Sequence, residues 1–507
     1  MKIVENVFKN YTTVETFNRL VEYNTIPEFL TKIKDQYQDN VAVGQTNKEI
    51  TYNNLIIDTQ KVCTVLKENN ILTKQNVGVI CNNNYDFVKS SLGIMAYGAV
   101  ATLLPIQLDE KIIFGCCMKY SLSALFYEAC IEEKIAFAKK MAPNVKFIKI
   151  EEYNVLPTEF NFEIRKEDPA CIVLTGGTTG KSKGAILSHR ALLKGTLNGT
   201  FGVKEVFNQV YYSIMPLTHV FGLIRNLLTS LYTGSKIYFC TDKRNMFKEI
   251  KEVKPTILIL VPALAELFLN LCKQFGIGFV GGALKTIICG GASVPPYLVT
   301  EFPKLGVCLL PGYGLTEAAN LVSGNPDGCK NPSSVGFLYP DQEIKIVDGE
   351  LWLKGDNLMD GYYNEPEENA IAYVDGWFKT GDLVKLDDDG YLYIIGRVKD
   401  IIVLSNGENV SPLYIETKIN NIDAIQDSLV TLEKNEFGAE ILQVEVFLRQ
   451  AIVQNLNITN IQEYIECQIE NVNQELFDYE RIKKVIIRDI DFERSPSMKI
   501  IRPKKEL

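Results

Sequence analysis

Short apolar runs alternate with amphipathic stretches between about residues 50 and 345, and this alternation constrains the fold more than any other feature of the sequence. The run NVGVICNN precedes YDFVKSSLGIMAYG, which has helical spacing, and TILILV precedes a stretch that opens with Pro262. Such alternation is typical of a doubly wound α/β sheet. After about residue 343 the pattern changes to strands joined by turns, ending in a hairpin, a helix and a strand. We therefore predict an α/β fold with a large, multi-subdomain N-terminal domain over residues 1–398 and a small α+β C-terminal domain over residues 399–507.

The overall composition disfavours several classes of protein. At 507 residues the chain is too long for a single core, and its 46% hydrophobic and 23% charged residues are ordinary for a globular protein. The net charge of −9 disfavours binding to nucleic acid or to anionic membranes. The N-terminus lacks the apolar core of a signal peptide, and no apolar run reaches the ~20 residues of a membrane span. We expect a cytoplasmic protein without a transmembrane segment.

Cysteine and histidine are too scattered or too few for most metal centres. Twelve cysteines show no Cys-x-x-Cys spacing, and the only histidines are His189 and His219. A multi-histidine metal centre is therefore excluded, and the cysteines are expected to be buried thiols.

The stretch LTGGTTGKSKG, residues 174–184, has the composition of a phosphate-binding loop. A P-loop would need glycine where Thr175 stands, and a helix beginning at about Lys181 would have Gly184 in its first turn, which costs roughly 1 kcal/mol relative to alanine. We therefore predict strand, turn, strand. The glycines and hydroxyl groups still suit phosphate. An ordinary surface turn rich in glycine and threonine remains the alternative.

Two further apolar runs, LKTIICGG and GVCLLPGYG, end in glycine. In open α/β sheets ligands bind beyond the carboxyl ends of the strands, so these turns are candidate binding positions. Each glycine alone is explained equally well as the end of a strand.

Together with the loop, further motifs stand in order along nearly the whole chain. They are EITYNNL, LGIMAYGAVATLLP, PLTHVFG, GGASVPP, GYGLTE, GELWLKGDNLMDGYYN, GWFKTGDL, GRVKDIIVLSNGENVSP and RSPSMKIIRP. With this set the chain closely resembles the adenylate-forming (AMP-binding) superfamily, and its motifs are most similar in form to those of acyl- and aryl-CoA synthetases. The resemblance implies that a carboxylate attacks the α-phosphate of ATP, and that a thiol of coenzyme A or phosphopantetheine then takes the acyl group from the adenylate. It also implies a magnesium ion.

The resemblance implies that the loop closes over the β- and γ-phosphates of ATP. The residues assigned to this role are Thr175, Gly177, Thr178, Thr179 and Gly180, with Lys183 beside them. Thr178 is also assigned to catalysis and to the metal. Gly176 stands where the family usually has serine, and Ser182 where it usually has proline; losing the serine hydroxyl is expected to weaken the grip by roughly 0.5–1.5 kcal/mol.

Further nucleotide contacts follow from the same resemblance. Tyr313 is expected to pack on adenine, Thr316 to contact phosphate, and Glu317 to bind magnesium as a catalytic ligand. As alternatives, Glu317 is a helix-capping residue and Asp382 a turn residue. The other positions assigned to the nucleotide are Gly290, Gly291 and Ala292 beside adenine, Gly312 and Gly314 around Tyr313, Asp382 on the ribose hydroxyls, and Arg397 supporting it.

The C-terminal motif implies a catalytic lysine, Lys499, that bridges the reacting carboxylate and the α-phosphate. Met498 replaces the usual glycine, which puts the delivery of this lysine in question. Without the other motifs, a lysine near a C-terminus is by default solvated surface. The resemblance also implies that the small domain is mobile and swings about a hinge near Lys399, which is assigned to the cofactor-binding set.

The segment MPLTHVFGL bears on the class of acid substrate, because no aspartate stands next to His219. Amino-acid adenylation domains commonly carry such an aspartate, so the segment resembles the acyl- and aryl-CoA synthetases instead. His219 is expected to border the reacting carboxylate in a catalytic role, with a buried core histidine as the alternative. The expected walls of the acid pocket are Val220, Phe221, Gly222, Cys289, Gly312 and Gly314. Their glycines predict room for a sizeable apolar or aromatic acid.

Four functions remain open at this point. The first is an ATP- and magnesium-dependent ligase joining a carboxylic acid to coenzyme A. The second is a freestanding ligase that loads an acyl carrier protein. A P-loop ATPase is opposed by the loop spacing, and a weakened nucleotide-binding protein is suggested only by Gly176, Ser182 and Met498.

Overall fold

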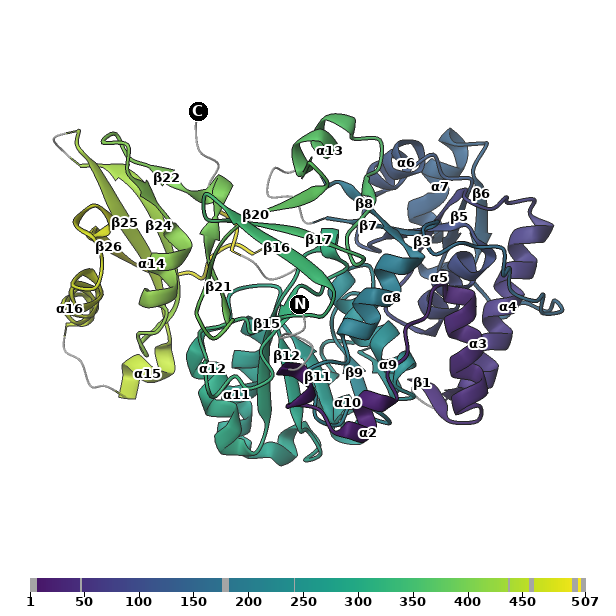
Figure 1. Cartoon of the computed structure of the whole chain (residues 1–507), viewed down its shortest axis with the longest axis horizontal. Helices are drawn as coiled ribbons and strands as arrows, with labels where there is room; N and C mark the ends of the chain where they lie inside the picture. The colour runs from purple at the N-terminus through teal and green to yellow at the C-terminus, as the bar shows by residue number, and fades with distance from the viewer. Residues whose placement is uncertain are drawn as a thin grey trace.

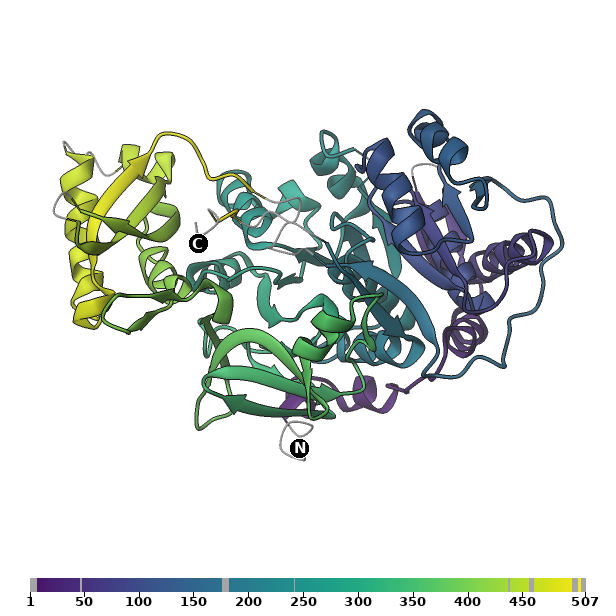
Figure 2. The same cartoon turned by 90° about the horizontal axis from the view of Figure 1, so that it is seen from above.

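The computed structural model describes residues 7–45, 48–175, 182–240, 242–435, 438–455, 460–494 and 500–502. Figure 1 shows a large N-terminal part and a smaller C-terminal part, and Figure 2 places the smaller part at the same end of the long axis. The predicted α/β class, with a large N-terminal and a small C-terminal domain, is confirmed.

The first large sheet has the strand order β15-β14-β13-β12-β11-β9-β10-β1-β2. Its central strands pair in parallel, and β2, β14 and β15 are antiparallel additions at its edges. The bounds are β1 (Val41–Gln45), β2 (Lys48–Thr51), β9 (Val210–Ser213), β10 (Lys236–Phe239), β11 (Ile257–Leu260), β12 (Thr286–Cys289), β13 (Cys308–Tyr313), β14 (Ser323–Gly324) and β15 (Phe337–Leu338). β12 and β13 are the two predicted strands that end in glycine.

The second large sheet has the order β18-β8-β7-β4-β3-β5-β6. The strands from β7 to β6 are parallel, whereas β8 and β18 are antiparallel. Its bounds are β3 (Asn76–Ile80), β4 (Val100–Leu104), β5 (Ala124–Tyr127), β6 (Lys146–Lys149), β7 (Pro169–Leu174), β8 (Gly184–Ser188) and β18 (Gly361–Tyr362).

Helices cover these sheets, and α5 (Tyr85–Tyr97) is buried along nearly its whole length. Its buried polar side chains have partners close by: Lys89 Nζ lies 2.7 Å from Asp86 Oδ1, and Ser91 Oγ donates to the Phe87 carbonyl at 2.8 Å. Pro262 opens α11, as predicted, because its missing N–H is unpaired at a first helical position anyway. The other helices of this part are α2 (Val14–Asn18), α3 (Ile26–Tyr37), α4 (Tyr52–Glu68), α6 (Glu110–Lys119), η1 (Ala129–Ile131), α7 (Glu132–Met141), α8 (His189–Asn198), η2 (Phe221–Leu228), α9 (Thr229–Tyr232), α10 (Met246–Val253), α11 (Pro262–Phe275), η3 (Ile277–Val280), α12 (Pro296–Glu301), η4 (Phe302–Leu305) and η5 (Thr316–Ala318).

A third, mostly antiparallel sheet follows and has the order β16-β17-β20-β19, with β21 on β20. Its bounds are β16 (Gln342–Val347), β17 (Glu350–Gly355), β19 (Tyr373–Val374), β20 (Trp377–Leu386) and β21 (Leu392–Arg397), with α13 (Pro366–Ala372) alongside. The predicted hairpin turn at Asp387 is present, since the Gly390 N–H donates to the Asp387 carbonyl at 3.0 Å.

The C-terminal part has its own core, a sheet of β24, β25 and β26 covered by helices. Its bounds are η6 (Val398–Asp400), β22 (Ile402–Val403), β23 (Asn409–Val410), α14 (Pro412–Ile419), β24 (Ile425–Lys434), β25 (Glu440–Leu448), α15 (Gln450–Asn455), α16 (Ile461–Asn473), η7 (Asp478–Glu480) and β26 (Ile482–Arg488). It contacts the large part through Arg449, whose Nε lies 2.7 Å from Glu266 Oε1 on α11 and whose guanidinium lies 4.6 Å from the Tyr297 ring centre. Among the helices within the described ranges, none has both the length and the apolar character that crossing a bilayer requires.

His189 is a fully buried core histidine at the start of α8. Its Nδ1 accepts a hydrogen bond from the Ile26 N–H at 3.2 Å, and burial lowers its pKa from 6.5 to about 4. The unfolded chain therefore binds more protons than the folded chain between pH 6.5 and pH 4, and stability falls as the pH falls through that window.

We expect the free energy of unfolding to fall by about 3 kcal/mol between pH 7 and pH 4 on account of His189. Urea unfolding at a series of pH values measures this change. A His189→Asn variant, which keeps an acceptor for Ile26, should lose that part of the pH dependence, and His219→Asn should retain it. Parallel pH profiles for wild type and His189→Asn would contradict this assignment.

Candidate active site

The loop predicted to bind phosphate joins the antiparallel strands β7 and β8. The Thr175 N–H donates to the Lys183 carbonyl at 2.8 Å, and the Lys183 N–H donates to Thr175 Oγ1 at 3.4 Å. The next helix begins only at His189, so the prediction of strand, turn, strand is confirmed for the flanking residues. The remaining loop residues assigned from the sequence lie outside the described residues, namely Gly177, Thr178, Thr179 and Gly180, and so does Gly176.

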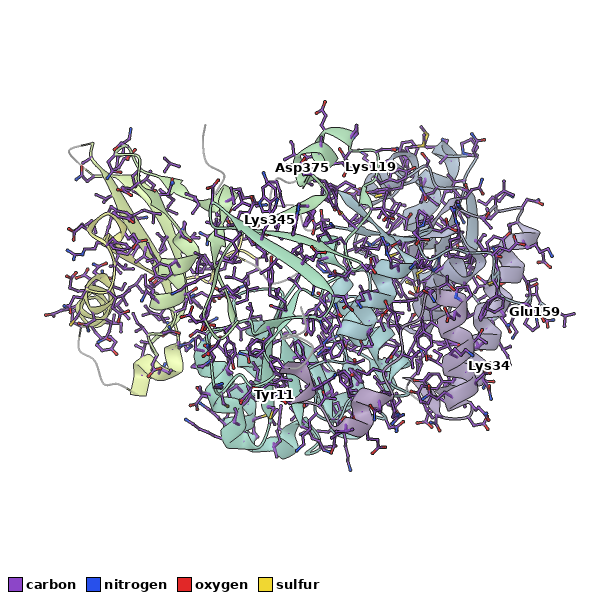
Figure 3. All side chains as sticks on the ribbon, viewed as in Figure 1. Tyr11, Lys34, Lys119, Glu159, Lys345 and Asp375 are labelled. Atoms are coloured by element: carbon purple, nitrogen blue, oxygen red, sulfur yellow. The ribbon has the colours of Figure 1, made fainter. Side chains whose placement is uncertain are left out.

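Two lysines lie near the second end of this loop. Lys183 Nζ is 2.5 Å from Glu368 Oε2 on α13 and 4.9 Å from the centre of the Tyr362 ring. Lys119, labelled in Figure 3, donates to the Ser182 carbonyl at 3.2 Å and lies 3.0 Å from Glu365, just before α13. The loop therefore ends beside α13 and β18, with Lys183 held over the Tyr362 ring.

Glu317 contacts Tyr362, the same tyrosine that lies under Lys183. It lies in η5, after β13, and its Oε1 accepts a hydrogen bond from the Tyr362 hydroxyl at 2.7 Å. Burial and then the Glu317 charge raise the pKa of Tyr362, so the phenol stays protonated and donates. Glu317 lies in the first turn of η5, whose N-cap residue Leu315 makes no side-chain capping bond. Tyr362 therefore brings Lys183 and Glu317 together.

The environment of Glu317 fits a magnesium ion bound with a nucleotide. No cluster of three or more His, Cys, Asp or Glu side chains suited to a metal occurs within the described part of the chain. Mg²⁺ commonly takes one or two carboxylates and completes its shell with phosphate oxygens and water. The half-buried Glu317 carboxylate, with one oxygen oriented by Tyr362, supplies such a ligand. The ion would neutralise phosphate charge.

Asp382, Arg397 and Tyr313 form a second polar cluster. Asp382 is only 2% exposed, and its Oδ1 lies 2.8 Å from Arg397 Nε while its Oδ2 accepts from the Tyr313 hydroxyl at 2.6 Å. A carboxylate can accept about four hydrogen bonds, so Asp382 retains capacity for further donors. Burial, followed by the charge of Asp382, raises the pKa of Tyr313 well above its usual value.

A bulge in the β20–β21 hairpin places Arg397 opposite Asp382. Val384 pairs with Ile394, but Leu383 pairs with Gly396, so Ile395 is an extra residue and the register shifts by one. Its carbonyl accepts from Ser411 Oγ at 2.6 Å. Bulges of this kind re-aim side chains near binding sites.

A small cavity lies at the carboxyl ends of β12 and β13, with about 30 Å³ open to water. Seven of the residues assigned from the sequence line it, namely Phe221, Cys289, Gly290, Gly291, Gly312, Tyr313 and Gly314. His219 is half-buried, Val220 is buried, Gly222 packs on the Pro216 backbone, and Ala292 is exposed; none of these four lines the cavity. Room for a sizeable acid was expected from the glycines, and Gly312 and Gly314 do line this cavity.

Gly314 is required by the close approach of two backbone segments. A Cβ added there would lie 1.2 Å from the Asn320 carbonyl oxygen, whereas one added at Gly312 would meet only the Ser323 carbonyl oxygen at 3.5 Å.

We therefore expect Gly314→Ala to lower the free energy of unfolding by about 3 kcal/mol, and the matched Gly312→Ala change to cost less than about 1 kcal/mol. Urea unfolding of both variants measures the difference. Equal stability of the two variants would contradict the close packing at Gly314.

Two functional candidates were missed from the sequence. Tyr362 lies within a motif that was recognised, but nothing in its spacing indicated contact with Glu317, 45 residues away. Arg225 also lines the cavity, and the one available signal was an arginine inside the apolar run GLIRNLL. Of the remaining assigned residues, Thr316 is buried, Lys399 lies in η6, and Lys499 lies outside the described residues.

Comparison with protein families gives two matches in chain order. Residues 30–363 match the model described as AMP-binding enzyme, and residues 399–506 match the AMP-binding enzyme C-terminal domain. The chain belongs to the AMP-binding enzyme family. The resemblance to adenylate-forming enzymes predicted from the motifs is thereby confirmed.

Individual relatives are consistent with this family assignment. It is 31% identical to 4-coumarate–CoA ligase-like 6 of Arabidopsis thaliana over 74% of this chain and 68% of the relative. It is 27% identical to a long-chain-fatty-acid–CoA ligase of Bacillus subtilis over 84% of this chain and 86% of the relative. Among solved structures, the anthranilate CoA ligase AuaEII in complex with anthranoyl-AMP superposes with a TM-score of 0.83, at 20% identity over 95% of this chain and 96% of that one. The o-succinylbenzoate CoA synthetase of Bacillus subtilis, in complex with its acyl-adenylate intermediate, gives 0.79, at 20% identity over 95% and 98%.

Proposed function

We propose that this AMP-binding enzyme is an AMP-forming acid–thiol ligase, which activates a carboxylic acid with ATP and transfers the acyl group to coenzyme A. The observation that carries the proposal is a pair of polar clusters, one built on Glu317 in η5 and the other on Tyr313 at the end of β13. The first joins Glu317 with Tyr362 and Lys183, and the second joins Tyr313 with Asp382 and Arg397. One offers a metal ligand beside the phosphate loop, and the other a buried carboxylate for ribose hydroxyls.

The roles follow from charge and position. Glu317 would hold the magnesium ion that neutralises the phosphates, and Asp382 accepts from the ribose hydroxyls while Arg397 orients its carboxylate. The loop from Thr175 to Lys183, Thr178 included, cradles the β- and γ-phosphates. Lys499 bridges the attacking carboxylate and the α-phosphate. Because the substrates bring both nucleophiles, the protein mainly positions them and stabilises charge.

The small domain reorients between the two half-reactions, with its boundary and hinge at Lys399. In the present arrangement the ion pair between Arg449 and Glu266 ties it to α11. Since this pair joins the two parts, reorientation must break it. If no reorientation occurs, removing Lys499 will slow both half-reactions equally.

The first experiment is acid-dependent pyrophosphate release with ATP and magnesium, measured across fatty, aryl and amino acids with and without coenzyme A. The proposal requires AMP and a CoA thioester from a fatty or aryl acid. Adenylate formation that leaves coenzyme A unused would favour loading of a carrier protein through its phosphopantetheine. Turnover of amino acids alone, or release of phosphate in place of AMP, would refute the proposal.

A further inference from the structure

Arg225 is a buried cation to which the described residues offer no hydrogen-bond or ion-pair partner. Its exposed fraction is 3%, and its Nε and Nη1 atoms are fully buried without a hydrogen bond. Within the described ranges, the guanidinium forms no ion pair and no hydrogen bond. A buried charge is costly unless it is paired, so an unpaired one indicates a missing anionic partner.

The residues around Arg225 do not supply that negative charge. Tyr211 and Tyr339 are the phenols on which its charge acts, but burial raises the pKa of Tyr211 to about 12 and also raises that of Tyr339. Both stay neutral at physiological pH. Tyr339 stacks on Phe8, with ring centres 5.3 Å apart, and forms part of an aromatic wall with Phe201. The guanidinium is therefore buried among neutral groups, and burial would strengthen its attraction for an anion.

Arg225 also lines the cavity that the assigned active-site residues share. Phe221, Cys289, Gly314 and Arg225 all belong to its wall. Arg225 lies on η2, an eight-residue stretch of π-helix that begins at Phe221, just after His219. π-helical turns are rare and occur frequently at functional sites. An acid bound in this cavity would therefore lie beside Arg225.

We propose that Arg225 binds a second carboxylate of the acid, so that this ligase activates a dicarboxylic acid. The inference rests on the proposed function and names the substrate class for the same site. The planar guanidinium can bind a carboxylate through two parallel hydrogen bonds, which gives both charge neutralisation and orientation.

The test compares acids in matched pairs: butanoic with succinic, hexanoic with adipic, octanoic with suberic, and benzoic with terephthalic acid. The kcat/KM of acid-dependent pyrophosphate release is measured for wild type, Arg225→Met and Arg225→Lys. Arg244→Met serves as control, because Arg244 is 90% exposed and remote from the cavity lining. Wild type should favour the diacid at least about 10-fold in one pair or more.

Arg225→Met should lower kcat/KM for the favoured diacid by at least about 100-fold and change that of the matched monoacid less than about threefold. The kcat/KM of Arg225→Lys for the favoured diacid should lie between those of wild type and Arg225→Met. Lysine keeps the charge but cannot form the two parallel hydrogen bonds. Without any acid, Arg225→Met should unfold at a temperature equal to or above that of wild type, because an unpaired buried charge has been removed.

Two results would overturn the inference while leaving the ligase function intact. One is a wild-type preference for the monoacid in every pair, and the other is an equal loss for both members of a pair in Arg225→Met. If no acid of any class supports pyrophosphate release, the proposed function itself fails, and this inference fails with it.

Discussion

Replacing Lys499 by alanine should reduce acid-dependent adenylate formation by about 1,000-fold, the range expected when a charge that stabilises a phosphoryl-type transition state is removed. Transfer of the acyl group from a pre-formed adenylate to coenzyme A should change by less than about threefold. Rapid-quench measurement of each half-reaction alone tests both expectations. In the proposed mechanism, Lys499 supplies its positive charge during adenylate formation. The effect of the alanine should therefore be confined to the first half-reaction.

The residues that flank positions 495–499 are held by ion pairs within the small domain. Arg494 bridges to Ile500 and lies 2.6 Å from Asp427, and Arg502 Nη1 lies 2.9 Å from Glu416 Oε1 on α14. Burial raises the pKa of Glu416, against the opposing effect of Arg502. An alanine at 499 leaves both ion pairs intact, so a loss of activity would not reflect loss of the small domain.

Lys484→Ala is the matched control for Lys499→Ala, because Lys484 is an exposed lysine on β26 of the same domain. It should leave both half-reactions unchanged. Equal slowing of the two half-reactions by Lys499→Ala would contradict both the catalytic role of Lys499 and the proposed reorientation about Lys399.

The alternation of strand and helix was sufficient to predict the fold class, because hydrophobic periodicity is local. The start of α11 at Pro262 and the hairpin turn at Asp387 were also predictable, since proline and turn residues restrict the backbone directly. The order of the strands in each sheet could not be predicted, because it depends on which strands pair with one another. The addition of β18 to β8, which brings Tyr362 to the phosphate loop, joins segments more than 170 residues apart.

Apart from Arg397 beside Asp382, which the resemblance implied, the candidate site was predicted as a set of residues and not as a set of contacts. Tyr313 was expected to pack on adenine, whereas the hydrogen bond from its hydroxyl to Asp382 was not expected. The bulge at Ile395 has no glycine at the inserted residue and no turn motif, so the register that places Arg397 opposite Asp382 could not be derived from the sequence. Arg225 was hidden for a related reason: an unpaired buried charge is visible only once every neighbour is known.

Replacing Asp382 by asparagine should lower the free energy of unfolding by about 3 kcal/mol and raise the KM for ATP at least about 10-fold. Removing one member of a buried ion pair costs about 3–5 kcal/mol, and the lower end applies because the Arg397 side chain is 36% exposed. The ATP effect follows because an amide offers the ribose hydroxyls a single neutral acceptor oxygen, where the carboxylate offers two charged ones. Urea unfolding and initial rates of AMP formation at varied ATP measure the two effects.

Tyr313→Phe separates the contribution of the phenol from that of the ion pair. It removes only the 2.6 Å hydrogen bond and leaves Arg397 on Asp382, so about 2 kcal/mol of stability should be lost. The double variant Asp382→Asn with Arg397→Gln should lose less than the sum of its single changes, because the two residues stabilise each other. Additive losses in that cycle, or an unchanged KM for ATP in Asp382→Asn, would show that the cluster supports the β20–β21 hairpin without binding the nucleotide.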